Sequence, residues 1–69
     1  MSYERIVMDA AKARGRRITL WAAECAVRSE KGRLDATRLA QALRKLVAAG
    51  RLQPIPGPNV TYEIPKGRR

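Results

Sequence analysis

Residues 34–52, LDATRLAQALRKLVAAGRL, decide how this chain folds. The large apolar residues of this stretch recur at steps of three and four, a spacing that places them on one face of an α-helix. They are Leu39, Leu43, Leu46 and Val47. Asp35 precedes the run and predicts an N-cap, because its carboxylate can accept from the free N–H groups of the first turn. Gly50 follows the run and predicts a left-handed stop, so we expect a helix over residues 35–49.

The opposite face of this predicted helix carries hydrogen-bond donors and, after Asp35, no acid. Such a face suits a partner that is negatively charged and accepts hydrogen bonds. The alternative interpretation is a solvated surface, which is the commoner role for an arbitrary basic helix. The donors are Thr37, Arg38, Gln41, Arg44 and Lys45.

The length of 69 residues predicts one small domain, which we place at residues 1–65, followed by a basic tail at residues 66–69. Hydrophobic residues make up 45% of the chain and many are alanine, which favours close helix packing over wholesale disorder. The formal net charge of +9 favours polyanions. Nucleic acid is the first candidate, and an acidic protein or an anionic membrane surface comes behind it.

The residue types argue against an enzyme, a metal site, a cofactor or a small-molecule ligand. The chain has no histidine, and its single cysteine, Cys25, therefore has no histidine to act as its base or to complete an ordinary zinc site. We expect Cys25 to be an inert thiol of the helix core, and one cysteine fits a reducing cytoplasm. No apolar run approaches the length of a membrane span, and the first residues do not resemble a signal peptide.

Two further helices precede the main one. The apolar pattern predicts a helix over residues 2–14 with Ser2 as its N-cap, and a second helix over residues 20–29 with Thr19 as its cap. Trp21 lies one position off the apolar stripe of this second helix, which favours a place at the edge of the domain. The polar residues 28–33 then predict the loop that leads into the main helix.

After the main helix, the period of the apolar residues changes from that of a helix to that of a strand. Residues 60–64, VTYEI, alternate apolar and polar side chains as a half-buried strand does, and PGPN at 56–59 predicts the turn before it. Pro54 and Pro56 cannot donate backbone hydrogen bonds, so the first arm of this hairpin should be short or lie at a sheet edge. The extended segment 16–19 has one aliphatic residue and needs a partner strand elsewhere.

The order helix, short strand, helix, helix and hairpin resembles the winged helix-turn-helix family of DNA-binding domains. The likeness covers nearly the whole chain and assigns no subfamily. It implies an α+β fold of three helices and a small antiparallel sheet, in which segment 16–19 joins the hairpin wing as a third strand. The residues that carry it are Ile18-Thr19, Leu34, Leu39, Leu43 and Leu46, the helix end LRKLVAAGRL, and the hairpin segments PGPN and VTYEI.

The resemblance also implies double-stranded DNA as the partner, with helix 35–49 in the major groove. There Arg38 can bond the O6 and N7 atoms of guanine as a fork, and Gln41 can pair with N6 and N7 of adenine. Thr37 can bond a phosphate or touch a thymine methyl group, while Arg44 and Lys45 lie further along and suit phosphates.

Two basic groups outside this helix are candidates for contacts with phosphates of any sequence. The first group surrounds the exit of the first helix, and the second lies at the end of the chain. The alternative for each group is a solvated surface with no partner. For the first group this alternative is almost as well supported as phosphate contact, and for the second group it is slightly favoured. The residues are Arg14, Arg16 and Arg17, and then Lys66, Arg68 and Arg69.

Two features depart from the family pattern. The predicted loop 28–33 is longer than the tight turn of the commonest bacterial regulators, and the wing tip has no lysine or arginine, leaving Asn59 as its side-chain donor. We expect a small transcriptional regulator that works by occupying DNA in the cytoplasm or nucleoid. Its regulation would come from concentration, a homodimer or a partner protein. A protein-interaction module, which the neutral wing would suit, and an RNA-binding domain are the alternatives.

Overall fold

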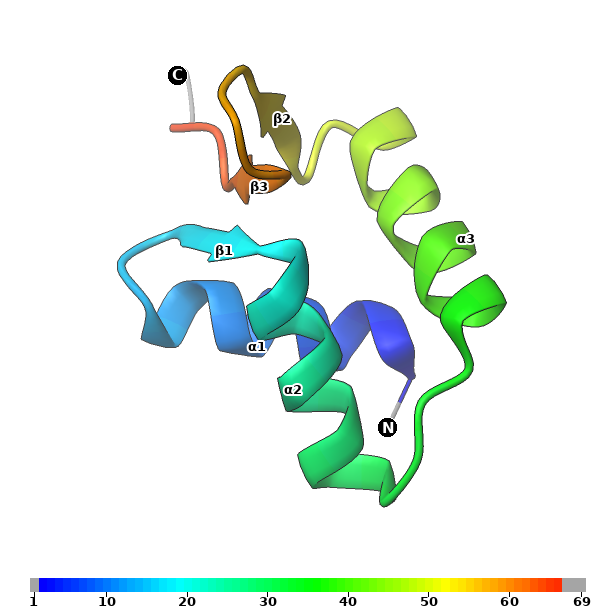
Figure 1. Cartoon of the computed structure of the whole chain (residues 1–69). Helices are drawn as coiled ribbons and strands as arrows, with labels where there is room; N and C mark the ends of the chain where they lie inside the picture. Colours follow the sequence, from blue (N-terminus) through cyan, green and yellow to red (C-terminus); the bar gives the residue numbers. More distant parts are fainter. Residues whose placement is uncertain (1, 67–69) are drawn as a thin grey trace.

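Residues 2–66, the part of the chain that the computed structural model describes, form three helices and a three-stranded antiparallel sheet (Figure 1). The class predicted from the sequence, α+β, is confirmed, as is the order of the elements. None of the helices in residues 2–66 combines the length and the apolar character that crossing a membrane requires. The elements are α1 (Tyr3–Ala13), β1 (Arg17–Thr19), α2 (Leu20–Lys31), α3 (Ala36–Ala48), β2 (Gln53–Ile55) and β3 (Thr61–Glu63).

All three helices begin at the residues that the sequence predicts as caps. The caps are Ser2 for α1, Thr19 for α2 and Asp35 for α3. In each case a side-chain oxygen accepts from the backbone N–H three residues further on, at 3.2, 3.0 and 3.2 Å respectively. These bonds satisfy donors that the first helical turn leaves free, which fixes where each helix starts.

The end of α3 is also as predicted. Gly50 has a φ of 76°, the left-handed conformation that glycine adopts without steric cost. The N–H of Arg51 then donates to the carbonyl of Leu46 at 2.9 Å, closing the last turn. This turn sends the chain back toward the core, where Leu52 is buried.

The predicted end of α2 was wrong. The helix runs to Lys31 and not to residue 29, and Gly32 ends it with a φ of 79° and an N–H bond to the carbonyl of Arg28 at 2.8 Å. Polar residues 28–31 stay helical because Arg28 and Lys31 suit the negative end of the helix dipole. The connection to α3 is therefore residues 32–35, and the long loop predicted at 28–33 does not exist.

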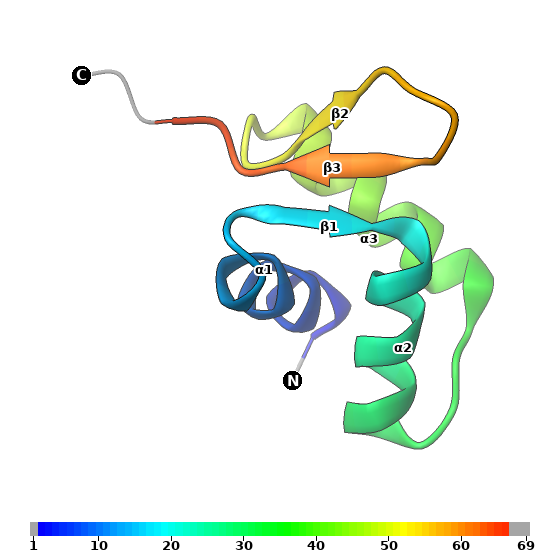
Figure 2. The same cartoon turned by 60° about the vertical axis from the view of Figure 1, so that its left-hand side comes forward.

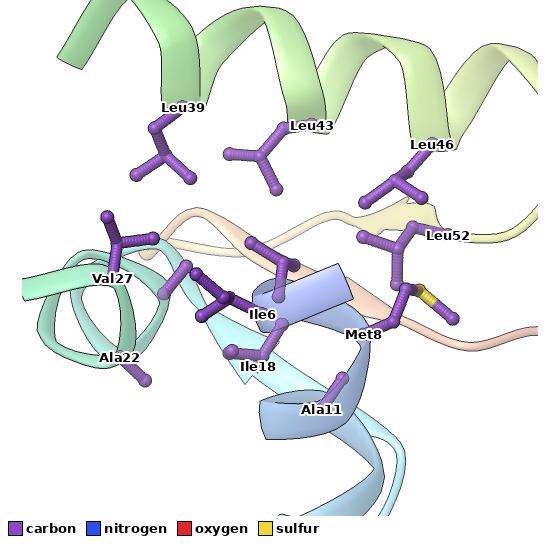
Figure 3. Close-up of a cluster of buried hydrophobic side chains, with 12 residues drawn as sticks. Ile6, Met8, Ala11, Ile18, Ala22, Val27, Leu39, Leu43, Leu46 and Leu52 are labelled. Atoms are coloured by element: carbon purple, nitrogen blue, oxygen red, sulfur yellow. The ribbon is translucent and has the colours of Figure 1, made fainter. Parts of the chain in front are cut away.

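One apolar core joins the three helices to β1 and to Leu52. Figure 3 shows three leucines of α3 pointing toward side chains of α1, α2 and β1. Small alanines at buried positions of α1 and α2 let these helices approach closely, as the composition predicts. The cluster consists of Ile6, Val7, Met8, Ala11, Ile18, Ala22, Ala23, Val27, Leu39, Leu43, Leu46 and Leu52.

The sheet has the order β1-β3-β2, so the isolated segment near Ile18 does pair with the hairpin (Figure 2). Ile18 of β1 and Pro54 of β2 both lie opposite Tyr62 of β3. As expected from its prolines, β2 is three residues long and lies at an edge of the sheet.

Val60 does not follow the alternation that the sequence predicts. The strand begins at Thr61, and Val60 is 53% exposed, whereas Tyr62 and Ile64 are half-buried as expected. Val60 lies beyond the last pair of the sheet, Thr19 with Thr61. Its carbonyl instead accepts from the N–H of Leu20 at 2.9 Å, which places it beside the start of α2.

Candidate nucleic-acid interface

The donors predicted on α3 all reach solvent together. Leu39, Leu43 and Leu46 are buried on the opposite side and fix the rotation of the helix about its axis. The helix lies at one side of the molecule, so this face is not covered by another element (Figure 1). The exposed donors are Thr37, Arg38, Gln41, Arg44 and Lys45.

Arg38 lies close to the one acid at the start of α3. Its Nε atom is 4.0 Å from Oδ2 of Asp35, and the two side chains are 73% and 52% exposed. An ion pair of this length and exposure contributes little, so the guanidinium can exchange Asp35 for a ligand at small cost. The carboxylate also accepts from the backbone N–H of Arg38, which keeps Asp35 engaged as the cap.

The two flanks of α3 differ in chemistry. On the side toward the start of α1, Arg38, Gln41 and Lys45 line a hollow of about 290 Å³, which Glu4 of α1 also lines. On the side toward α2 and the hairpin, Ala40 and Val47 line a largely apolar groove together with Arg44. The basic flank is therefore the one that extends the donor face of the helix.

Lys31 joins this basic flank, although the sequence analysis did not select it. It lines the same hollow as Arg38 and Lys45, and its Nζ atom lies 5.6 Å from the ring centroid of Tyr3. The hydroxyl of Tyr3 accepts from the backbone N–H of Asp35 at 3.1 Å, so one aromatic side chain ties the cap of α3 to α1 and supports Lys31.

Arg33, in the connection between α2 and α3, lines a neighbouring hollow with Lys31 and Arg38. Two acids, Glu30 and Asp35, also line it. The place of Arg33 beside the start of α3 adds a further exposed cation to the basic flank. The sequence signal for both cations was Gly32, since a helix that ends there brings residues 31 and 33 next to the cap of α3.

The other predicted basic group lies at the far side of the molecule. The connection between α1 and β1, which carries Arg14, Arg16 and Arg17, lies at the opposite side of the molecule from α3 in Figure 1. Arg16 donates from Nη2 to the carbonyl of Pro65 at 3.0 Å, and Nε of Arg17 is 3.6 Å from Oε2 of Glu63. These two side chains tie β1 to β3 and to the residues that follow it. The structure does not bring this group together with the donors of α3.

The predicted basic tail lies partly within the described residues. Lys66 is exposed. The segment after β3, residues 64–66, leaves the sheet on the same side of the molecule as the connection between α1 and β1 (Figure 2). The contact of Arg16 with Pro65 agrees with that placement. Arg68 and Arg69 lie outside the described residues.

The hairpin is neutral where a wing would contact DNA. Residues 53–62 contain no lysine or arginine, and the exposed tip at 56–59 offers the side chain of Asn59 as its donor. Glu63 faces Arg17 across the sheet. No electrostatic feature of this hairpin therefore favours a phosphate backbone.

Comparisons with protein-family models, curated proteins and solved structures find no match to this chain. The resemblance to winged helices therefore rests on the order of the elements and on the residues of α3. Within residues 2–66, no three acidic or cysteine side chains gather as a metal site would require. What the geometry offers is a row of exposed guanidinium, amide and ammonium groups on one regular helix, which can bind an anion with hydrogen-bond acceptors.

Proposed function

We propose that this protein binds double-stranded DNA as a winged helix, with α3 in the major groove. The observation that carries this proposal is the exposed face of α3, which presents five donors in regular array. A major groove about 12 Å wide admits one α-helix, and its base edges offer acceptors to such donors.

The position of each donor along α3 suggests its role. Arg38 and Gln41 lie in the first half of the helix and suit base edges, with Thr37 beside them. The exposed cations around them suit the phosphates on either side of the groove. These are Lys31, Arg33, Arg44 and Lys45.

The topology supports the winged-helix interpretation over a simple basic surface. The short connection 32–35 between α2 and α3 removes the main departure that the sequence suggested. The sheet order β1-β3-β2, with the hairpin directly after α3, supports its interpretation as a wing, although its neutral tip favours recognition by α3 alone. We infer that the protein regulates transcription by occupying its site, not by chemistry.

Competition between polyanions at several salt concentrations tests this proposal. If Lys31, Arg33, Arg44 and Lys45 each neutralise one phosphate, binding to duplex DNA should follow a log–log salt slope of roughly −3 to −4. Duplex DNA should compete better than duplex RNA or heparin at equal charge. An affinity that does not change with salt contradicts nucleic-acid binding. A higher affinity for duplex RNA than for duplex DNA makes RNA the partner. Competition by heparin alone indicates binding by charge without recognition.

A further inference from the structure

A second surface of the molecule is apolar and lies on the other flank of α3. Both α2 and α3 pack against α1, and a groove of about 510 Å³ stays open between them and the hairpin. Leu20 from α2, Val47 from α3 and Tyr62 from β3 are among its walls. Among the residues proposed to contact DNA, Arg44 lines this groove, whereas Thr37, Arg38, Gln41 and Lys45 do not. Contact with DNA therefore does not explain the apolar lining.

Exposed apolar residues continue the groove beyond its end. Leu20 lines the groove, and its N–H donates to the carbonyl of Val60 at 2.9 Å. Trp21 follows directly, and Trp21 and Val60 are 69% and 53% exposed. A large aromatic side chain left in water next to an apolar hollow is typical of an anchor for a protein partner.

The dimensions of the groove fit one helix. Its wall on α3 runs from Ala36 to Val47. At 1.5 Å per residue this wall is roughly 16 Å long, about three helical turns. A trough between two helices with an apolar floor receives the apolar face of a third, through side chains spaced at i, i+3 or i+4, and i+7.

The charge around the groove selects the partner. Arg44 lies in the wall on α3 and the acid Glu24 in the wall on α2. Arg28 is exposed on α2 one turn after Glu24, so two cations and one acid border the groove. A second copy of this chain would bring the same formal charge of +9 to the contact, which like-charge repulsion opposes. We propose that the groove receives an acidic amphipathic helix of a partner protein, with its apolar face on the floor and its carboxylates toward Arg44 and Arg28.

Trp21, the single tryptophan of the chain, reports on this site. The probes are synthetic amphipathic helical peptides of about four turns, with Leu, Ile, Met or Phe on the apolar face and Glu on the flanks. Peptides with the same apolar faces and Lys in place of Glu are the charge control. We expect a saturable blue shift of the tryptophan emission with at least one acidic peptide and none with the basic set. No saturable shift from any acidic peptide, or equal binding of both sets, overturns the proposal.

Two exposed alanines of α3 provide matched variants. Ala40 lines the groove, whereas Ala48 lies on the exposed face of the same helix outside it. Ala40→Glu should lower the affinity for the acidic peptide about tenfold or more, because the new carboxylate repels the peptide and fills space in the groove. Ala48→Glu should leave this affinity unchanged. Equal losses from both variants overturn the groove as the site. Both substitutions add an acid to α3, so both should weaken binding to duplex DNA. The affinity for DNA therefore does not distinguish the two variants, and the affinity for the peptide tests the groove separately.

Discussion

Two basic regions of this molecule contain the same number of cations and differ in what surrounds them. On α3, Arg38, Arg44 and Lys45 project from a regular helix whose one acid is the cap, Asp35. In the connection between α1 and β1, Arg14, Arg16 and Arg17 are closer together in sequence. Arg16 and Arg17 bind groups on β3 or after it, whereas Arg38 pairs with the cap of its own helix.

The fold, and not the number of cations, therefore decides whether an arginine side chain contacts its own protein or is free to bind a ligand. Arg17 stands opposite Glu63 in the register of β1 and β3, so its charge is partly compensated inside the sheet. Arg16 donates to a backbone carbonyl that follows β3. We therefore propose that α3 is the recognition element, and that Arg16 and Arg17 join β1 to β3.

The largest expected effect comes from removing the support of α3. Leu43 is 4% exposed in the core, and Leu43→Ala should lower the free energy of unfolding by about 2–5 kcal/mol, because it removes apolar contacts and leaves a cavity. Urea denaturation measures the loss, and Val60→Ala at an exposed site is the control, with an expected change within about 0.5 kcal/mol. If Leu43→Ala melts like the parent protein, α3 is not anchored as described.

The next effect concerns discrimination between DNA sequences. On a duplex selected from a random pool, Arg38→Ala or Gln41→Ala should cost roughly 1–3 kcal/mol of binding free energy, and much less on a scrambled duplex. The reason is that base contacts distinguish sequences and phosphate contacts do not. Fluorescence anisotropy titrations with both duplexes measure the two costs.

Arg16→Ala is the control from the second basic region and should change neither affinity by more than a small factor. If Arg38→Ala and Gln41→Ala weaken both duplexes equally, α3 is merely a charged surface. If Arg16→Ala weakens both duplexes and makes the salt slope shallower by roughly one unit, the second region does contact phosphates and the contrast between the regions fails.

The smallest effect sharpens the role of the second region. A double-mutant cycle between Arg17→Ala and Glu63→Ala should give a coupling free energy of about 0.2–1 kcal/mol in stability, as partly exposed ion pairs do. Thermal denaturation at low and high salt measures it, and the coupling should shrink as salt screens the pair. A coupling of zero at low salt would show that Arg17 does not tie β1 to β3.

Local sequence determined the starts of the helices and the face that α3 buries. A cap bonds an N–H three residues away, and a leucine stripe depends on the helical period, so neighbours in the chain carry the whole signal. The end of α2 was misplaced because polar residues 28–31 are equally compatible with a loop, and the capping position of Gly32 decides between them.

The tertiary structure alone decided which cations are engaged and which surfaces stay open. Arg17 meets Glu63, and Lys31 meets Tyr3, through contacts between segments far apart in the chain, which no local pattern encodes. The exposure of Trp21 and the groove beside it follow from α2 and α3 both packing on α1. A periodic pattern names the buried face of each helix, but the relative placement of helices depends on how their side chains fit together.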